Sequence, residues 1–244
     1  MSMQQLAATT VVEADRAALA RVSALPLDGF RDEHLATQLR RALASERVPD
    51  AGALARRLAA DPTALRRFRR SIAVSVTGPF RDPHQFDLLE RALLPPLLAR
   101  PGRLRVWSAG CSDGSELISV GRVLDRLGGL ERAQLLGSDL LAENVEQARA
   151  GTAALPEPEL RRRLRWEQRD LLAGEAPAGS WQLIVCRNVA IYFTAAARER
   201  LDVLLAGALA PGGVLLLGRA ERLRDAAALG LVPAGPHAYR RAPR

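Results

Sequence analysis

The stretch Leu104–Glu116 reads LRVWSAGCSDGSE, and it decides the fold that we predict. Its first six residues are typical of a β-strand, and Gly110 and Gly114 bound a tight turn behind them. From Ser115 to Leu127, apolar side chains then recur on one helical face. The turn lacks the GxGxxG spacing of a dinucleotide fingerprint. It is therefore either an ordinary turn between strand and helix or a place where a ligand approaches the backbone.

The alternation of strand and helix continues to the C-terminus. An apolar run such as Trp181–Cys186 is typical of a buried parallel strand. We expect an α/β fold with a Rossmann-like sheet that is mostly parallel and has one antiparallel strand. A short helix is expected after the fifth strand. The expected strands are 104–109, 133–138, 163–169, 181–186, 214–218 and a closing pair at 231–233 and 237–241, and the expected helices between them are 115–127, 142–150 and 195–209.

The N-terminal part has a different pattern, because helical spacing replaces the alternation. Leu35, Leu39 and Leu43 recur at every fourth residue, and Asp50 and Asp61 stand where helices are expected to begin. We expect an all-helical domain over residues 1–75, a linker with a connecting helix over 76–102, and a sheet domain over 103–244.

Polar residues follow two strands at their carboxyl ends, the edge at which such sheets bind ligands. Asp139 follows the second strand and could accept hydrogen bonds from the two hydroxyls of a ribose, or it could cap the next helix. The fourth strand runs into Arg187 and Asn188. A sheet core has no use for this pair unless something polar lies above it. Local capping or an ion pair is the other interpretation.

Four segments resemble the CheR family of protein-glutamate O-methyltransferases. Leu104–Glu116 is similar to the family's RVWSAGCSTGEE, and Trp181–Phe193 (WQLIVCRNVAIYF) is similar to its DLIFCRNVLIYF. Ala210–Gly218 (APGGVLLLG) is similar to KPGGLLFLG, and Ser75–Pro83 (SVTGPFRDP) is similar to NxTxFFRDP. The resemblance implies a class I methyltransferase sheet with an N-terminal helical domain. It also implies S-adenosyl-L-methionine as cofactor and S-adenosyl-L-homocysteine as product.

The resemblance further implies site residues by position. Tyr192 would lie beside the transferred methyl group, and Tyr192 and Arg81 are the expected catalytic residues. No metal is expected. The ribose would lie at Asp139 and the adenine near Asp170. The expected cofactor contacts are Ser75, Thr77, Arg81, Gly110, Gly114, Glu116, Asp139, Asp170, Leu171, Arg187 and Asn188.

Three departures from the family pattern bear on the substrate. Gly78-Pro79 replaces a pair that includes the first Phe of FFR, and Gly114–Ile118 (GSELI) replaces GEEPY. Only residues 151–163 separate the second helix of the sheet domain from the third strand. Chemotaxis members often carry a receptor-docking β-subdomain there, and this chain is expected to lack it. The chain would then either recognise its substrate through the N-terminal helical region or methylate something other than a chemoreceptor.

Composition limits the partners. The formal charge of +8 favours an acidic partner, and 4% aromatic residues without basic interleaving argue against nucleic acid. No apolar run is long enough to span a membrane and no secretion signal is evident, so we expect no membrane insertion and a cytoplasmic location. Cys111 and Cys186 are expected to be packing residues. Two arginine pairs are expected to share helix faces: Arg40 with Arg47, and Arg66 with Arg70.

These observations predict methylation of glutamate carboxylates on an acidic or glutamate-rich protein segment. A glutamate is already an anion near neutral pH, so the transfer needs no general base. Two alternatives stay open: a small-molecule methyltransferase on the same fold, and a non-catalytic module that binds S-adenosylmethionine. The sequence leaves the oligomeric state open.

Overall fold

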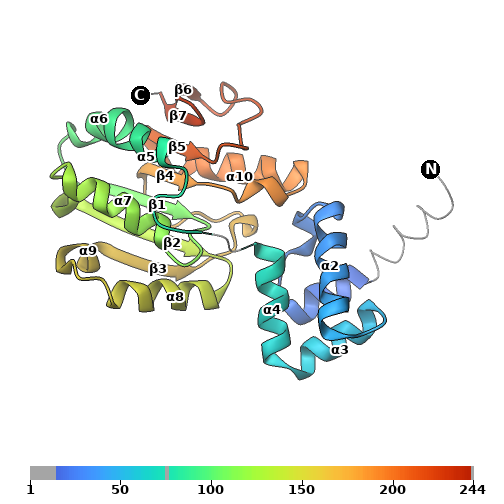
Figure 1. The fold of residues 1–244 in the computed structure, drawn as a ribbon. Helices are drawn as coiled ribbons and strands as arrows, with labels where there is room; N and C mark the ends of the chain where they lie inside the picture. Colours follow the sequence, from blue (N-terminus) through green and yellow to red (C-terminus); the bar gives the residue numbers. More distant parts are fainter. Residues whose placement is uncertain (1–14, 75–76, 243–244) are drawn as a thin grey trace. The chain divides into compact units, whose positions relative to one another are not determined.

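The computed structural model describes residues 15–74 and 77–242. The chain forms two compact units, which are Met1–Ser75 with Tyr192–Ala197, and Val76–Ile191 with Arg198–Arg244. The first is helical and the second contains the sheet (Figure 1). None of the helices in the described ranges is long and apolar enough to cross a lipid bilayer.

Aspartates begin two helices of the helical unit, as the sequence predicts. The Asp50 side chain accepts the N–H of Ala53 at 2.7 Å, and the Asp61 side chain accepts the N–H groups of Thr63 and Ala64. Each bond satisfies a backbone donor that has no partner within the helix. The helices are α2 (Asp32–Glu46), α3 (Ala51–Ala60) and α4 (Pro62–Ala73), with a further helical stretch over residues 15–23 and a 3-10 turn at Leu27–Gly29.

One expectation for this unit is wrong. Arg47 does not share a helix face with Arg40, because α2 stops at Glu46 and Arg47 adopts a left-handed conformation with φ 54°. Arg66 and Arg70 do lie in one continuous helix, α4, four residues apart.

The second unit holds a seven-stranded sheet with strand order β3-β2-β1-β4-β5-β7-β6. β1 to β5 run parallel, β7 pairs antiparallel with both neighbours, and the expected fold class is confirmed. The strands are β1 (Leu104–Ala109), β2 (Ala133–Asp139), β3 (Leu164–Gln168), β4 (Trp181–Cys186), β5 (Leu209–Leu217), β6 (Leu231–Gly235) and β7 (Ala238–Arg241).

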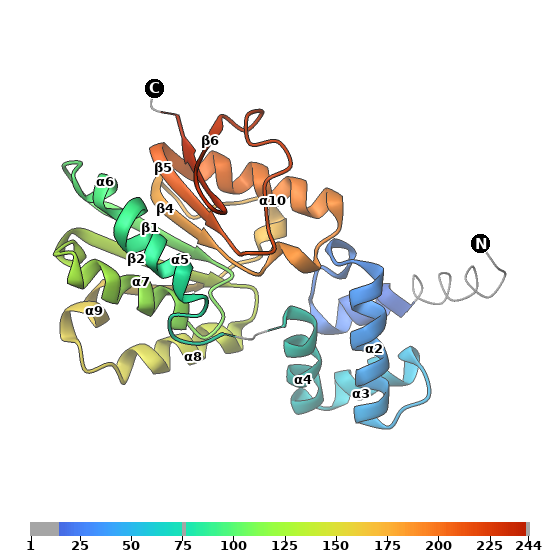
Figure 2. The same cartoon turned by 45° about the horizontal axis from the view of Figure 1, so that its top comes forward.

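Helices cover the sheet, and α7 packs against β1 and β2 (Figures 1 and 2). The helices are α5 (Pro83–Leu88), α6 (Leu94–Leu98), α7 (Ser115–Arg126), α8 (Ala142–Ala153), α9 (Pro158–Arg163) and α10 (Ala195–Ala208). A π-helical turn, Leu89–Leu93, joins α5 to α6, and short 3-10 turns lie at Leu130–Arg132, Leu171–Ala173 and Ala190–Tyr192.

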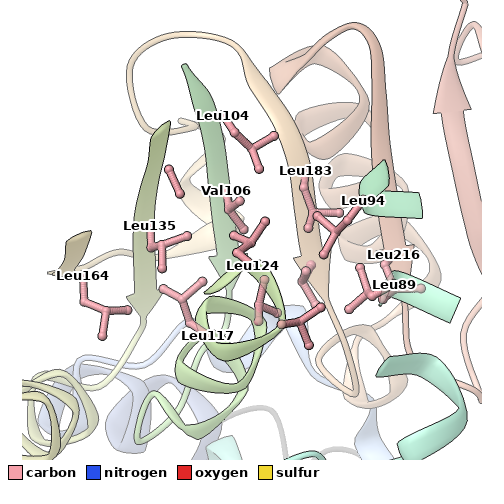
Figure 3. Close-up of a cluster of buried hydrophobic side chains, with 14 of the residues drawn as sticks. Leu89, Leu94, Leu104, Val106, Leu117, Leu124, Leu135, Leu164, Leu183 and Leu216 are labelled. Atoms are coloured by element: carbon pink, nitrogen blue, oxygen red, sulfur yellow. The ribbon is translucent and has the colours of Figure 1, made fainter. Parts of the chain in front are cut away.

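Leucine and valine side chains fill the interface between one face of the sheet and its helices (Figure 3). Val106 of β1 pairs in register with Leu135 of β2 and Leu183 of β4, and all three side chains are fully buried. Leu117 and Leu124 of α7 belong to the same buried cluster (Figure 3). Residues 83–98 contribute five further buried side chains to this core, so this segment is part of the packed domain.

Three local expectations differ from the structure. β5 begins at Leu209 rather than at residue 214, because Leu209 pairs with Trp181 before an irregularity that contains the two glycines. Turns replace the short helix expected after β5. A helix that was not expected, α9, precedes β3, and the described residues between α8 and β3 form no strand. The sheet domain therefore has no β-subdomain at this point.

Candidate functional site

The carboxyl ends of β1, β2 and β4 meet at one edge of the sheet, since these strands are parallel neighbours. Asp139 ends β2 and reaches the turn that follows β1. Its Oδ2 accepts the N–H of Ser112 at 2.9 Å, and its Oδ1 accepts the N–H of Leu141 and the Nδ2 of Asn144. Asp139 therefore ties the glycine turn to the start of α8.

Asp139 is only 7% exposed, and burial raises the pKa of its carboxyl, against the hydrogen bonds that lower it. Oδ1 has two hydrogen-bond donors, whereas Oδ2 has one. A carboxylate oxygen can accept two hydrogen bonds. One position on Oδ2 can therefore take a donor from a ligand, such as a ribose hydroxyl. The ribose interpretation of Asp139 is compatible with this geometry. The capping interpretation is wrong, because the N-cap residue of α8 is Leu141 and no side chain caps this helix.

The fold itself requires glycine at positions 110 and 114. Their φ angles are +79° and +86°, which residues with a Cβ rarely adopt. A Cβ at Gly110 would lie 2.5 Å from Val189, and one at Gly114 would lie 2.5 Å from the ring of Trp166. Packing thus explains both glycines, while their role as cofactor contacts stays a prediction.

Arg187, at the end of β4, is the centre of a buried polar cluster. Its Nε donates to Gln85 Oε1 at 2.6 Å, and its Nη1 donates to Glu116 Oε2 at 3.1 Å. Its Nη2 donates to the Asp82 carboxylate at 2.8 Å and to the Arg81 carbonyl at 2.7 Å. Because the Arg187 side chain is 3% exposed, most of its donors serve the protein. Arg187 therefore does form ion pairs, while its contact with the cofactor stays a prediction.

Glu116 completes the cluster from the first turn of α7. Its Oε1 accepts the hydroxyl of Ser108 at 2.8 Å, and burial raises the pKa of its carboxyl although Arg187 and Ser108 lower it. Three expected site residues, Arg81, Glu116 and Arg187, are thus brought together. Thr77, four residues before Arg81 in the sequence, is half-buried. Ser75 lies outside the described residues.

Asn188 follows in a left-handed conformation with φ +60°. Its side-chain amide has no hydrogen-bond partner in residues 77–242 of the described chain. Its backbone N–H donates to Glu221 Oε2 at 2.7 Å. Glu221 was missed by the sequence analysis, because a helix was expected where it lies. The available signal was an acidic residue three positions after Gly218, the glycine that follows the buried strand β5.

Asp170 and Leu171 follow β3, the strand next to β2. The Asp170 side chain accepts the N–H of Leu172 at 2.8 Å and starts a 3-10 turn. The neighbouring N–H of Arg169 donates to the Asp139 carbonyl at 2.8 Å. The two expected acidic contacts, Asp139 and Asp170, therefore follow adjacent strands at the same edge.

Tyr192 belongs to the helical unit. Its carbonyl accepts the N–H of Arg31 at 2.9 Å, and its ring centroid lies 4.7 Å from that of His34. Burial lowers the pKa of His34, against a hydrogen bond with the Ile72 carbonyl. Within the described ranges, the Tyr192 hydroxyl makes no hydrogen bond, so it is available to a ligand. Its catalytic role stays a prediction.

The cysteines are packing residues in the described structure. Cys111 and Cys186 are free thiols, 2% and 0% exposed, and burial raises the pKa of both well above the ordinary thiol value. A protonated, buried thiol is a poor nucleophile. The expectation that neither takes part in the chemistry agrees with this environment.

The edge therefore combines an acidic residue beside a glycine turn with a buried arginine cluster and an amide side chain. The family model described as CheR methyltransferase, SAM binding domain, matches residues 75–155 and 156–233. The chain belongs to the CheR methyltransferase family. It is a CheR-like, S-adenosylmethionine-dependent methyltransferase.

Curated CheR relatives match over most of their length. A chemotaxis protein methyltransferase of Listeria innocua is 33% identical over 204 residues, covering 74% of this chain and 78% of the relative. Chemotaxis protein methyltransferase 1 of Pseudomonas aeruginosa is 28% identical over 253 residues, covering 90% of this chain and 92% of the relative. A solved structure, the glycopeptide N-methyltransferase MtfA complexed with sinefungin, is 18% identical with a TM-score of 0.44, covering 59% of this chain and 50% of that one.

The residues of this CheR domain fit the cofactor chemically. The Asp139 carboxylate keeps an accepting position for a sugar hydroxyl, and the Asn188 amide is half-buried with its donors and acceptor free within the described ranges. Both lie at the strand ends where α/β sheets bind nucleotides. Individual cofactor contacts stay predictions.

Proposed function

We propose that this CheR-family enzyme methylates glutamate side chains in an acidic segment of a partner protein. The relatives carry the name chemotaxis protein methyltransferase. The observation that carries the finer proposal is the charge of the helical unit. Residues 15–73 contain twelve arginines and seven acidic residues, so this segment contributes +5 to the total of +8.

The arrangement of these arginines supports the proposal. The Glu46 carboxylate pairs with Arg57 and Arg67, and Arg57 also pairs with Asp61, so both guanidinium groups have carboxylate partners within the helical unit. Arg66 and Arg70, on the exposed surface of α4, pair with no carboxylate in the described part of the chain. Among the residues that the structure describes, Arg66 donates only to the hydroxyl of Thr63, at 3.0 Å. Two exposed guanidinium groups one helical turn apart match the spacing of carboxylates on an acidic helix.

The proposed reaction needs few groups from the protein. Bound S-adenosylmethionine supplies a methyl group on a positively charged sulfur. The acceptor glutamate, with an ordinary pKa of about 4.3, arrives as an anion. Its oxygen forms the new bond to carbon, and the electron pair of the broken carbon–sulfur bond stays on sulfur. The protein has to align the acceptor and exclude water. Arg81, whose carbonyl is fixed by Arg187, and Tyr192 are our candidates for this alignment.

The absence of a β-subdomain between α8 and β3 bears on the substrate. In this chain α9 fills that position. Recognition would then depend on the helical unit, and the acceptor need not be a chemoreceptor. A cytoplasmic location belongs to the same proposal, since the methyl donor is made inside the cell.

A labelled-methyl assay tests the proposal. The purified chain is incubated with methyl-labelled S-adenosylmethionine and a lysate or an acidic helical protein, and protein is separated before treatment with base. Volatile, base-released label in the protein fraction is expected, because esters hydrolyse and N-methyl groups do not. Label on a small metabolite alone would favour the small-molecule enzyme. No transfer to any acceptor despite cofactor binding would favour the non-catalytic module.

Charge reversal tests the surface. The double variant Arg66→Glu/Arg70→Glu is expected to raise KM for the protein acceptor at least fivefold without changing cofactor affinity. Arg91→Glu/Arg103→Glu is the matched control, since it changes the net charge equally on exposed positions of the sheet-containing unit. Equal effects of the two double variants would contradict a role for the α4 surface.

A further inference from the structure

Glu221 is a buried carboxylate that no expected function explains. It is 1% exposed and lies in the turn after β5. Its Oε2 accepts the backbone N–H groups of Asn188 and Gly218, at 2.7 and 2.9 Å, and its Oε1 accepts the N–H of Ala190 at 2.7 Å. An ionised carboxylate only accepts hydrogen bonds, so three donors suit it well.

Two of the three bonds go to the turn that follows β4, and the third goes to Gly218 after β5. The N–H groups of Asn188 and Ala190, two residues apart in this turn, both donate to the Glu221 carboxylate. The left-handed φ of Asn188, +60°, is uncommon for a residue with a side chain. The Glu221 carboxylate therefore fixes the backbone that orients the half-buried Asn188 amide.

Gly218 has no side chain, and the Glu221 carboxylate occupies the space where its Cβ would lie. A Cβ at Gly218 would lie 2.6 Å from Glu221 Oε2 and 2.8 Å from the Asn188 nitrogen. The Asn188 nitrogen belongs to the backbone and cannot move aside. A glycine is thus required here for Glu221 to reach Asn188.

The backbone of Glu221 is itself held by His237, just before β7, and by Gly218, just after β5. The Glu221 carbonyl lies 3.0 Å from His237 Nδ1, which must donate because a carbonyl only accepts, and the Glu221 N–H donates to the Gly218 carbonyl at 2.9 Å. Gln85, which accepts from Arg187, also donates to the Leu217 carbonyl at 2.7 Å. The ends of β4 and β5 are therefore fixed together on both sides of Asn188.

We propose that Glu221 is a positioning residue for cofactor binding, acting through the backbone of Asn188 and Ala190. It holds the Asn188 amide in the orientation that meets S-adenosylmethionine and its product. The inference goes beyond the proposed function, because it concerns the cofactor and holds for any methyl acceptor.

Calorimetry with S-adenosylhomocysteine on the full chain tests the proposal without an acceptor. Glu221→Gln places an amide nitrogen, which cannot accept a hydrogen bond, opposite one of the backbone N–H groups. We expect the variant to bind S-adenosylhomocysteine at least tenfold more weakly per folded molecule. Gly218→Ala keeps the carboxylate but displaces it from Asn188, and we expect a loss in the same direction. Asp202→Asn is the matched control, since Asp202 is a buried carboxylate of the same domain that accepts none of the three N–H groups. We expect its affinity to stay within twofold of the wild type.

Two further measurements keep the test decisive. If Glu221→Gln does not fold, Gly218→Ala alone decides the proposal by its affinity. Amide exchange of Asn188 and Ala190 is expected to be faster in either variant and unchanged in Asp202→Asn. Wild-type affinity in folded Glu221→Gln or Gly218→Ala would overturn the proposal. An equal loss of affinity in Asp202→Asn would also overturn it, because charge rather than the turn would then be responsible.

Discussion

The guanidinium of Arg187 lies 3.1 Å from the carboxylate of Glu116, and the two side chains are 3% and 13% exposed. They come from the end of β4 and the first turn of α7. Both were expected to contact the cofactor, and the structure pairs them with each other first. The pair therefore links the end of β4 to the start of α7 at the candidate site.

Arg187→Met should be strongly destabilising, because it removes the buried cation that pairs with the largely buried Glu116 and the partly exposed Asp82, whose side chains are 13% and 24% exposed. Removing one partner of a buried ion pair costs about 3–5 kcal/mol. Arg126→Met is the control, since Arg126 pairs with Glu90 at 2.8 Å between side chains that are 49% and 31% exposed. Exposed pairs contribute less than about 1 kcal/mol. Urea denaturation measures both, and a loss for Arg187→Met as small as that for Arg126→Met would contradict the prediction.

Gly137→Ala should destabilise the sheet domain, because Trp166 occupies the space of the missing side chain. A Cβ at Gly137 would lie 2.2 Å from the Trp166 ring. Overpacking of this kind costs about 1–3 kcal/mol. Gly151→Ala, in α8 with no atom within 4 Å of the added Cβ, should be neutral or stabilising by up to about 1 kcal/mol. Thermal unfolding of the two variants compares them, and a neutral Gly137→Ala would mean that Trp166 can move aside.

The fold was predictable from the sequence because its signals are local. Apolar runs such as Trp181–Cys186 specify buried strands, and Asp50 and Asp61 cap their helices. α9 was missed because its six residues include three consecutive arginines and present little apolar face. β5 begins earlier than expected, since pairing with β4 continues past its two glycines.

The site was predictable in its residues but only partly in its contacts. The position of Asp139 at a strand end follows from the alternation of elements. The partner of Arg187 does not, because Glu116 lies 71 residues away in the chain and only the folded sheet brings them together. Glu221 was missed because a helix was expected at its position, and two of its three N–H donors lie 33 and 31 residues away in the chain.

Asp202 should make the stability of the protein depend on pH. Burial raises the pKa of Asp202 from 3.8 to about 6, with Glu221 and Glu199 adding to the rise and Arg198 opposing it. The folded state therefore binds this proton more tightly than the unfolded state. Its stabilising contribution is complete below pH 3.8 and is lost as the pH rises through 6.

The variant Asp202→Asn should remove this dependence. Between pH 4 and 7, its stability relative to the wild type should improve by about 1–2 kcal/mol, allowing for partial solvent screening. Urea denaturation at intervals of half a pH unit measures the difference. Parallel curves for the two proteins would show that Asp202 does not titrate in this range.

Asp139 has two possible roles that a single variant can separate, since it holds the backbone N–H groups of Ser112 and Leu141 and can accept a ribose hydroxyl. Asp139→Asn keeps the shape but offers one acceptor atom instead of two, so S-adenosylhomocysteine should bind at least tenfold more weakly, about 1.4 kcal/mol. Because burial raises the Asp139 pKa, wild-type affinity should fall as the pH is lowered and the carboxylate takes up its proton, whereas the affinity of the variant should stay flat. Calorimetry across the pH range, with the urea midpoint measured on the same samples, distinguishes the roles. A lower urea midpoint with unchanged affinity per folded molecule would show that Asp139 only holds the backbone, and that the ribose binds elsewhere.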